Sequence, residues 1–229
     1  MPEPIRIISS MATRQLLSEL IAEFARESSQ PVQLESVGGV EAARRVQAGE
    51  AFDIVALASD AIEKLVEAGQ LTRQSRVDLA RSGVAVAVRA GAPRSDLRDG
   101  DAVRRAVLAA KTLGYSTGPS GVALARQFER WGIAELIKDR IVQAPPGVPV
   151  GQLVAEGRVE LGFQQLSELM NLGGIEVLGP LPDDIQIITT FSAAVSARSA
   201  QPHAARALLA FLAAPALDAI RRRNGMDPA

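Results

Sequence analysis

Short apolar strands alternate with amphipathic helices in the first third of the chain, and this alternation limits the folds that the chain can adopt. A predicted strand at 5–9 precedes a helix in which Leu16, Leu20 and Phe24 recur at helical spacing. Strands at 32–36 and 52–59 follow, each with a helix behind it, the second helix beginning at Asp60 as its N-cap. Such alternation predicts a parallel sheet with helices on its faces, which binds ligands beyond the carboxyl ends of its strands.

A second series of elements follows a predicted crossover strand at 82–93. We expect helices at 101–110, 121–131, 134–140 and 150–157, and strands at 111–116, 141–145 and 159–164. Residues 177–184 are rich in turn formers, a long strand lies within 185–198, and two helices close the chain, the last ending at Gly225. We therefore predict an α/β fold of two lobes, residues 1–88 plus 187–229 and residues 89–186, each a mostly parallel sheet flanked by helices, with the ligand cleft between them.

Composition excludes several classes of function. Among 229 residues, 47% are hydrophobic and the net charge is −1, so the chain can bury a core and lacks the basic balance of a nucleic-acid binder. Cysteine is absent and His203 is the single histidine, expected on the surface of a helix, so neither a His-rich metal site nor a Ser-His-Asp or Cys-His catalytic set is expected. We expect no metal and no cofactor, and no apolar run reaches the roughly 18 residues of a membrane helix.

Three segments end a strand, pass through small residues and begin a helix. They are residues 8–13, 35–42 and 116–123. Each presents free N–H groups at a helix start, and that arrangement binds oxyanions without a full positive charge. Serine and glycine at one such place are usually simple caps, but three of these segments favour a shared anion site. The candidate residues are Ser10, Gly38, Gly39, Ser116, Ser120 and Gly121.

Other polar side chains could complete such a site. Gln164 and Gln165 follow an apolar strand and offer amide donors, although a polar helix start explains them equally well. Arg81 precedes the crossover strand, and we expect its side chain to reach the cleft. The remaining clustered arginines are expected on solvated helix faces: Arg44, Arg45 and Arg221 to Arg223.

The order and spacing of several segments resemble a known family. The segments "IRIISSMATRQLLSELIAEFARE", "AARRVQAGEAFDIVALASDAIEKLVEAGQL", "GPSGVALARQFERWGI" and "AARALLAFLAAPALDAIRRRNGMDP" are similar to type II periplasmic solute-binding proteins, specifically their molybdate-binding subfamily. The resemblance implies a two-lobed periplasmic-binding-protein-like fold. It also implies that Ser10 contacts the anion through its hydroxyl and N–H, that Ser120 donates its N–H, and that Val148 roughly matches a further backbone donor.

At three positions the chain departs from the pattern of that family. Gly39 stands where a second serine is expected, Gln165 where a tyrosine closes over the tetrahedral ion, and Arg81 where asparagine is usual. These changes enlarge the pocket, remove two hydroxyl donors and add groups that suit a planar carboxylate. We therefore expect a small di- or tricarboxylate as the ligand, with a molybdate site of shifted contacts as the alternative.

The resemblance leaves open whether the chain is a binding protein or an enzyme. A binder would be a monomer that closes on its anion and presents it to the membrane component of an ABC transporter. It would be periplasmic if a leader was removed and otherwise cytoplasmic, because "MPEPIRIISS" has no leader pattern. The related aconitate isomerases imply allylic proton transfer instead, which requires a base. The carboxylates nearest the proposed cleft are Glu35, Glu41 and Glu168. We expect each of these to be a cap or surface group, so no base is assigned. A cytoplasmic sensor domain is a third alternative.

Overall fold

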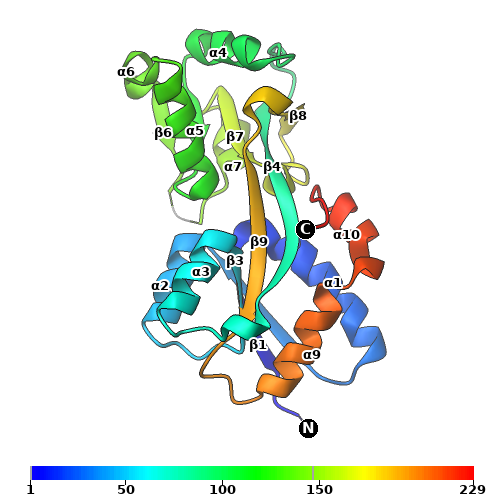
Figure 1. Cartoon of the computed structure of the whole chain (residues 1–229). Coiled ribbons are helices and arrows are strands. Elements are labelled where there is room, and N and C mark those ends of the chain that lie inside the picture. The colour runs from blue at the N-terminus through cyan, green and yellow to red at the C-terminus, as the bar shows by residue number, and fades with distance from the viewer. Residues whose placement is uncertain (1, 146) are drawn as a thin grey trace. The chain divides into compact units, whose positions relative to one another are not determined.

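In a computed structural model that describes residues 2–145 and 147–229, the chain divides into two compact units. Unit 1 comprises Met1–Arg81 and Thr190–Ala229, and unit 2 comprises Ser82–Thr189. Two strands, β4 (Val77–Arg89) and β9 (Ile188–Val195), run from one unit into the other (Figure 1). The sequence predicted a division after residue 88, next to the Gly/Pro segment that ends the strand. The two compact units instead divide between Arg81 and Ser82, in the middle of the uninterrupted strand β4.

Unit 1 contains the first three strands and part of β9. Strand β1 (Ile5–Ser10) pairs in parallel with β2 (Val32–Val37) and with β3 (Ile54–Ala58), and β9 is antiparallel to β3. The helices are α1 (Arg14–Glu27), α2 (Gly39–Gln47), α3 (Ser59–Glu67), α9 (Pro202–Leu212) and α10 (Asp218–Arg223), with short 3₁₀ turns at Met11–Thr13, Arg73–Ser75 and Pro215–Leu217.

Alternation along β1 explains how helices cover both faces of this sheet. Ile7 packs in the core formed with α1, α9 and α10, whereas its neighbour Ile8 packs in the core formed with α2 and α3 (Figure 1). Successive strand side chains point to opposite faces, so a run that is apolar at both positions is a strand buried on both sides. This half of the fold follows from the sequence pattern.

Unit 2 repeats this plan with shorter elements. Strand β5 (Leu113–Tyr115) pairs in parallel with β6 (Ile141–Gln143) and β7 (Leu161–Gln165), while β4 pairs antiparallel with β7 and with β8 (Ile175–Pro180). The helices are α4 (Gly100–Ala109), α5 (Pro119–Arg130), α6 (Ala134–Ile137), α7 (Val150–Ala155) and α8 (Leu166–Leu169), with 3₁₀ turns at Lys138–Arg140 and Asp183–Ile185.

The structure corrects several details of the prediction. Residues 175–180 form strand β8, although a turn was expected from 177 onward; β4 supplies its partner, and a register shift accommodates Gly179 at φ +139°. Helix α3 starts at Ser59 and not after Asp60, which lies in its first turn. The C-cap of α10 is Asn224, and Gly225 follows it in the left-handed conformation.

The arginines near the chain end are not all solvated, contrary to expectation. Arg221 is 1% exposed, and its guanidinium donates to main-chain carbonyl oxygens and to Asp218. The acceptors are Leu79 at 2.6 Å, Leu212 at 2.6 Å and Ala214 at 3.1 Å, with Asp218 Oδ1 at 3.0 Å. Arg221 therefore ties α10 and the end of α9 to β4.

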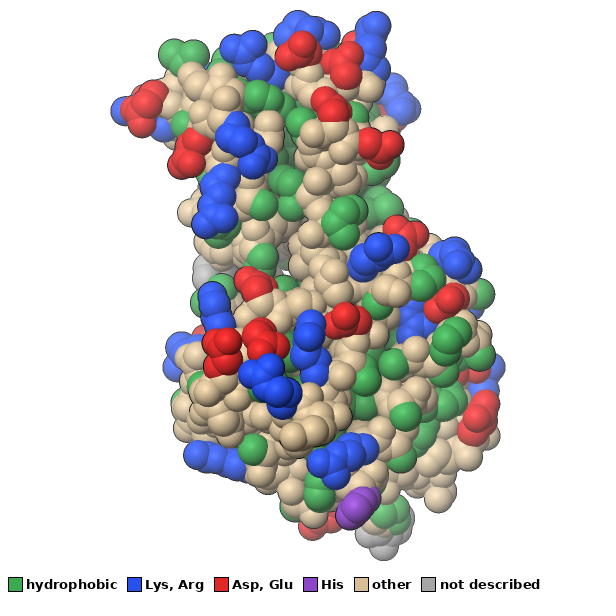
Figure 2. All heavy atoms as spheres, in the orientation of Figure 1, with side chains coloured by type: hydrophobic (Ala, Val, Ile, Leu, Met, Phe, Trp, Pro, Cys, Tyr) green, Lys and Arg blue, Asp and Glu red, His purple; other side chains and the backbone are tan. Residues whose placement is uncertain are grey.

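The surface carries both signs of charge, as expected for a net charge of −1. Figure 2 shows Lys and Arg side chains interspersed with Asp and Glu on the visible face of each unit. In the described part of the chain, no single helix has the length and apolar character needed to cross a membrane. The pair Pro202–Leu212 and Pro215–Arg223 meets those criteria only together, with a 53° bend between them.

Candidate functional site

In unit 1, the predicted anion-binding residues lie together at the carboxyl ends of two parallel strands. Ser10 ends β1 opposite Val37 of β2, and α2 begins at Gly39 directly after Gly38. A Cβ added at Gly39 would lie 3.7 Å from the Ser10 Cβ, so this helix start is adjacent to the serine. We call Ser10, Gly38 and Gly39 the unit-1 edge.

The unit-1 edge offers a hydroxyl and backbone donors, without a charged side chain of its own. The Ser10 hydroxyl has one long contact, 3.3 Å to Thr13 Oγ1, and no side chain caps α2. The α2 N–H groups therefore remain available, and the helix dipole adds partial positive charge. This is the chemistry of an anion site that does not depend on a cation.

Ser59, at the carboxyl end of β3, is a residue that the sequence analysis did not select. It has the same local pattern as Ser10, a strand that runs through serine into a helix. Its hydroxyl donates to the Thr190 carbonyl at 3.0 Å and lies 2.6 Å from Ser192 Oγ. Ser59 therefore joins α3 to β9, and its hydroxyl has partners within the fold.

In unit 2, the predicted residues after β5 form a tight turn. The Gly118 N–H donates to Ser116 Oγ at 3.4 Å, Pro119 opens α5, and Ser120 is buried. A Cβ on Gly121 would fall far inside the van der Waals contact distance to the Ser116 carbonyl oxygen, so only glycine fits there. The structure thus brings Ser116, Ser120 and Gly121 together at the start of α5.

The backbone donors expected after β6 have partners within unit 2. The Val148 N–H donates to the Pro145 carbonyl at 3.0 Å. At the start of α7, the Val150 N–H donates to Gln164 Oε1 at 2.8 Å. The Gln164 side chain therefore occupies the helix start that follows this turn.

Gln165 is buried, with its amide held by the two strands that enter unit 2. In the orientation that satisfies its neighbours, the amide nitrogen donates to Ser82 Oγ and Ser82 O, both at 3.0 Å, and the amide oxygen accepts from Thr189 Oγ1 at 2.8 Å. This network fixes the end of β7 against β4 and β9. Any contact with a ligand would have to exchange one of these bonds.

Arg81 is the last residue of unit 1 on β4. Its side chain is exposed, and its Nε donates to the Pro228 carbonyl at 3.1 Å. Among residues 2–145 and 147–229, no hydrogen bond or ion pair involves its two terminal nitrogens. Those nitrogens keep the geometry that binds a carboxylate with two parallel hydrogen bonds.

The three candidate carboxylates have different environments. Hydrogen bonds from Arg45 lower the pKa of Glu35, and those from Arg44 lower the pKa of Glu41. Arg45 is itself mostly buried, in contrast to the solvated position expected for it. Burial raises the pKa of Glu168 to about 7, and the hydrogen bond from Gln164 opposes this only in part. Glu168 is thus neither the cap nor the freely solvated group expected.

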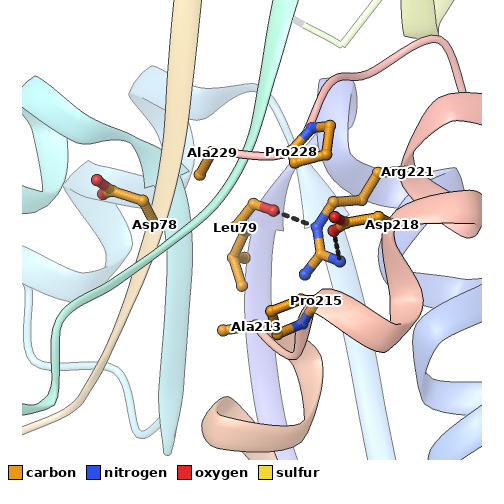
Figure 3. Close-up of a pocket in the computed structure, with 8 residues that line it drawn as sticks. All are labelled: Asp78, Leu79, Ala213, Pro215, Asp218, Arg221, Pro228 and Ala229. Atoms are coloured by element: carbon orange, nitrogen blue, oxygen red, sulfur yellow. Dashed lines mark hydrogen bonds and ion pairs between the residues drawn. The ribbon is translucent and has the colours of Figure 1, made fainter.

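A pocket of about 160 Å³ lies elsewhere in unit 1, between β4, the end of α9, α10 and the last residues of the chain. Figure 3 shows the Arg221 guanidinium in this pocket, hydrogen-bonded to Leu79 and Asp218. Because backbone carbonyls and Asp218 engage its nitrogens, we assign Arg221 a structural role. Within the described ranges, no group of three or more His, Asp or Glu side chains is placed to hold a metal ion.

Comparison with known proteins identifies the family and the fold of this chain. The profile of the bacterial extracellular solute-binding protein family matches residues 5–227. Over 187 residues, 80% of this chain and 70% of the relative, the chain is 40% identical to a Pseudomonas protein named aconitate isomerase.

Two solved structures have the same fold at low sequence identity. The periplasmic molybdate-binding protein of Azotobacter vinelandii has a TM-score of 0.80 at 20% identity, covering 97% of this chain and 98% of that one. The sulfate-binding protein of Mycobacterium tuberculosis also has a TM-score of 0.80, at 17% identity, covering 99% of this chain and 87% of that one. These likenesses confirm the predicted α/β fold of the two-lobed periplasmic binding proteins.

Proposed function

This chain belongs to the family of bacterial extracellular solute-binding proteins, and from that premise we propose that it binds a small di- or tricarboxylate. The observation that carries the proposal is the unit-1 edge, where Ser10 lies beside an uncapped helix start at Gly39. Unfilled donors at this place favour an anionic ligand. We propose that Ser116, Ser120 and Gly121 supply the donors of unit 2, with Val148 and Gln165 joining them when the ligand replaces their present partners.

Two features favour a carboxylate over a tetrahedral oxyanion. Gly39 leaves open the space that a side chain would fill beside Ser10, so the site accepts a larger ligand. The terminal nitrogens of Arg81 suit a planar carboxylate, which accepts two parallel hydrogen bonds from a guanidinium. A compact tetrahedral ion needs neither the extra room nor the bidentate cation.

A thermal-shift screen tests the ligand class. Molybdate, tungstate, sulfate, citrate, cis-aconitate and trans-aconitate are added separately at rising concentration. A ligand at one hundred times its dissociation constant stabilises the protein by roughly 2.7 kcal/mol, so it raises the melting temperature clearly. We expect tricarboxylates to give this shift. If only molybdate and tungstate do so, the carboxylate proposal is wrong.

A second candidate function is isomerisation of an unsaturated tricarboxylate. The specific observation in its favour is the relative of 40% identity named aconitate isomerase. The reaction needs an anion site of the same kind, with the addition of a group that moves a proton. Incubation of the protein with trans-aconitate, followed by chromatographic detection of the cis isomer, distinguishes this function from binding alone.

The partner and compartment follow from the binding hypothesis. We propose that a monomer delivers its anion to the membrane component of an ABC transporter and works in the periplasm. A solved neighbour of this fold is the substrate-binding domain of a Clostridium difficile molybdenum ABC transporter, at 16% identity and a TM-score of 0.75. Fractionation of cells that produce the natural full-length protein tests the compartment directly.

A further inference from the structure

Glu168 lies at the same edge of the unit-2 sheet as the serine turn. Strands β5 and β7 are parallel, with Tyr115 opposite Phe163, so their carboxyl ends lie at one edge. Ser116 follows β5 directly, and helix α8, which carries Glu168, follows β7 directly. Ligands of parallel sheets bind at this edge. We call Ser116 to Gly121, Gln165 and Glu168 the unit-2 edge.

The surroundings of Glu168 orient the carboxylate without neutralising it. Gln164 Nε2 donates to Glu168 Oε1 at 2.8 Å, and Gln164 Oε1 accepts from the Val150 N–H at 2.8 Å. Gln164 is therefore fixed at both ends of its amide and holds one carboxylate oxygen in place. Within the described part of the chain, no ion pair involves Glu168, and its side chain is only partly buried.

The other two candidate carboxylates lack these properties. Glu35 is 2.5 Å from Arg45 Nη1, and Glu41 is 2.7 Å from Arg44 Nη2, so each is neutralised by a guanidinium. A carboxylate in such a pair is a weak base, whereas a general base works best when its pKa is close to the operating pH. Burial gives Glu168 a pKa of about 7.

We propose that Glu168 is the general base of an allylic proton transfer on an unsaturated tricarboxylate, with Gln164 as its positioning residue. The inference rests on the proposed function, because it requires a tricarboxylate in the site. The free oxygen of Glu168 takes a proton from the methylene carbon next to the double bond, so a C–H bond breaks and an O–H bond forms. The electron pair moves the double bond one carbon along the chain, and the same proton returns to the former vinylic carbon.

This step is balanced without an oxidant or a cofactor. One C–H bond is lost and one is gained, the carboxylate of Glu168 is regenerated, and the substrate keeps its formula. Because the double bond is formed anew, it can be formed with the other geometry. The donors at the start of α5, Ser120 among them, lie at the same edge and would hold a substrate carboxylate, and charge that develops on the conjugated carboxylate would be stabilised there.

The test compares the wild type with Glu168→Gln, Glu168→Asp and the matched control Glu156→Gln. Glu156 lies in the same unit at the other end of α7, away from the unit-2 edge. Binding of trans-aconitate is measured by calorimetry, turnover by chromatography, and proton exchange by NMR in D₂O. A positioned general base contributes about 10²- to 10⁴-fold. We therefore expect Glu168→Gln to lower kcat at least 100-fold with little change in affinity, and Glu156→Gln to match the wild type.

A purely structural role for Glu168 would not produce the expected pH profile. The wild-type kcat/KM should rise with pH and level off above pH 7, while Glu168→Asp should keep this limb at a lower rate. If the glutamine variant does not fold, the aspartate variant still carries the test through its rate and profile. The inference is overturned if the glutamine variant stays within threefold of the wild type, or if the wild type binds trans-aconitate without turnover or exchange. Absence of any tricarboxylate binding by the wild type contradicts the proposed function itself.

Discussion

The unit-1 edge and the unit-2 edge are built on the same local plan but differ in how tightly they are packed and in how they handle charge. At the unit-1 edge a glycine leaves room beside Ser10, and the uncapped donors of α2 lie open. At the unit-2 edge Gly121 is pressed against the Ser116 carbonyl, Gln165 is fully engaged, and Glu168 adds a carboxylate.

This difference separates two tasks. An anion is bound best where donors are free and the nearby carboxylates are paired with cations. This describes the unit-1 edge, where Arg44 pairs with Glu41 and Arg45 with Glu35. A proton is moved best by a carboxylate held in a partly buried, uncharged surrounding, which describes the unit-2 edge. Substitutions at matching positions of the two edges should therefore have different consequences.

The largest contrast is expected between the two glycines. Gly121→Ala places a Cβ onto the Ser116 carbonyl oxygen, so the turn must open, and we expect a loss of more than about 3 kcal/mol of stability, the upper range for overpacking. Gly39→Ala meets only Ser10 at 3.7 Å and should change stability by less than about 1 kcal/mol. Urea unfolding of both variants measures this. Equal losses would show that the two edges are packed alike.

Replacing Glu168 should have a pH-dependent effect on stability. The pKa of this group rises from 4.5 to about 7 on folding, so its ionisation opposes the folded state. Relative to the wild type, Glu168→Gln should be unchanged near pH 4.5 and more stable above pH 7, by up to about 3 kcal/mol at the upper end.

Melting temperatures of the wild type and Glu168→Gln across pH 4.5–8.5 check this prediction. Using the difference between the two proteins removes the titration of all other groups. A constant difference over the whole range would show that Glu168 is not held in a buried, uncharged surrounding.

Much of the fold could be predicted because the apolar pattern of strands and helices is local. The consecutive apolar residues Ile7 and Ile8 predict that β1 is buried on both faces, and the glycine and serine turns mark the strand ends. Strand β8 could not be predicted in this way, because a segment with Gly179 and Pro180 becomes a strand only when β4 pairs with it. Partners distant in sequence decide such elements.

Side-chain environments were harder to predict for the same reason. The burial of Arg221 depends on carbonyls of β4 and α9. The raised pKa of Glu168 depends on its burial in the folded chain, which the hydrogen bond from Gln164 offsets only in part. The residues at the unit-1 edge needed no such information, because Ser10 and Gly39 are placed by two adjacent parallel strands. The positions of Ser10 and Gly39 could therefore be predicted from the sequence pattern, whereas the acid–base properties of Glu168 require the folded structure.

Ser10→Ala should lower ligand affinity with little effect on the fold. The hydroxyl has only the 3.3 Å contact with Thr13, so its loss leaves no strong bond unmade inside the protein. A hydrogen bond to a charged group contributes about 1.5–3 kcal/mol, so we expect the dissociation constant to rise roughly 10- to 100-fold.

Ser9→Ala is the matched control, since Ser9 is buried and its hydroxyl bonds Ser36 Oγ at 2.8 Å. We expect it to lower the melting temperature without changing the affinity per folded molecule. Calorimetric titration of both variants is the measurement. If Ser9→Ala weakens binding as much as Ser10→Ala, the hydroxyl of Ser10 is not a ligand contact.

The smallest effect, and the sharpest test of ligand choice, is expected for Gly39→Ser. A Cβ at this position is in ordinary contact with Ser10, so the serine fits and restores a hydroxyl that the molybdate-binding pattern contains. The added donor should strengthen molybdate binding by about 1 kcal/mol, roughly fivefold, while the lost space weakens tricarboxylate binding by a similar factor. The ratio of the two dissociation constants, measured by calorimetry on the variant and the wild type, should therefore move toward molybdate. An unchanged ratio would mean that the open position beside Ser10 does not select the larger anion. The unit-1 edge would then bind anions by their charge, without discriminating between them by size or shape.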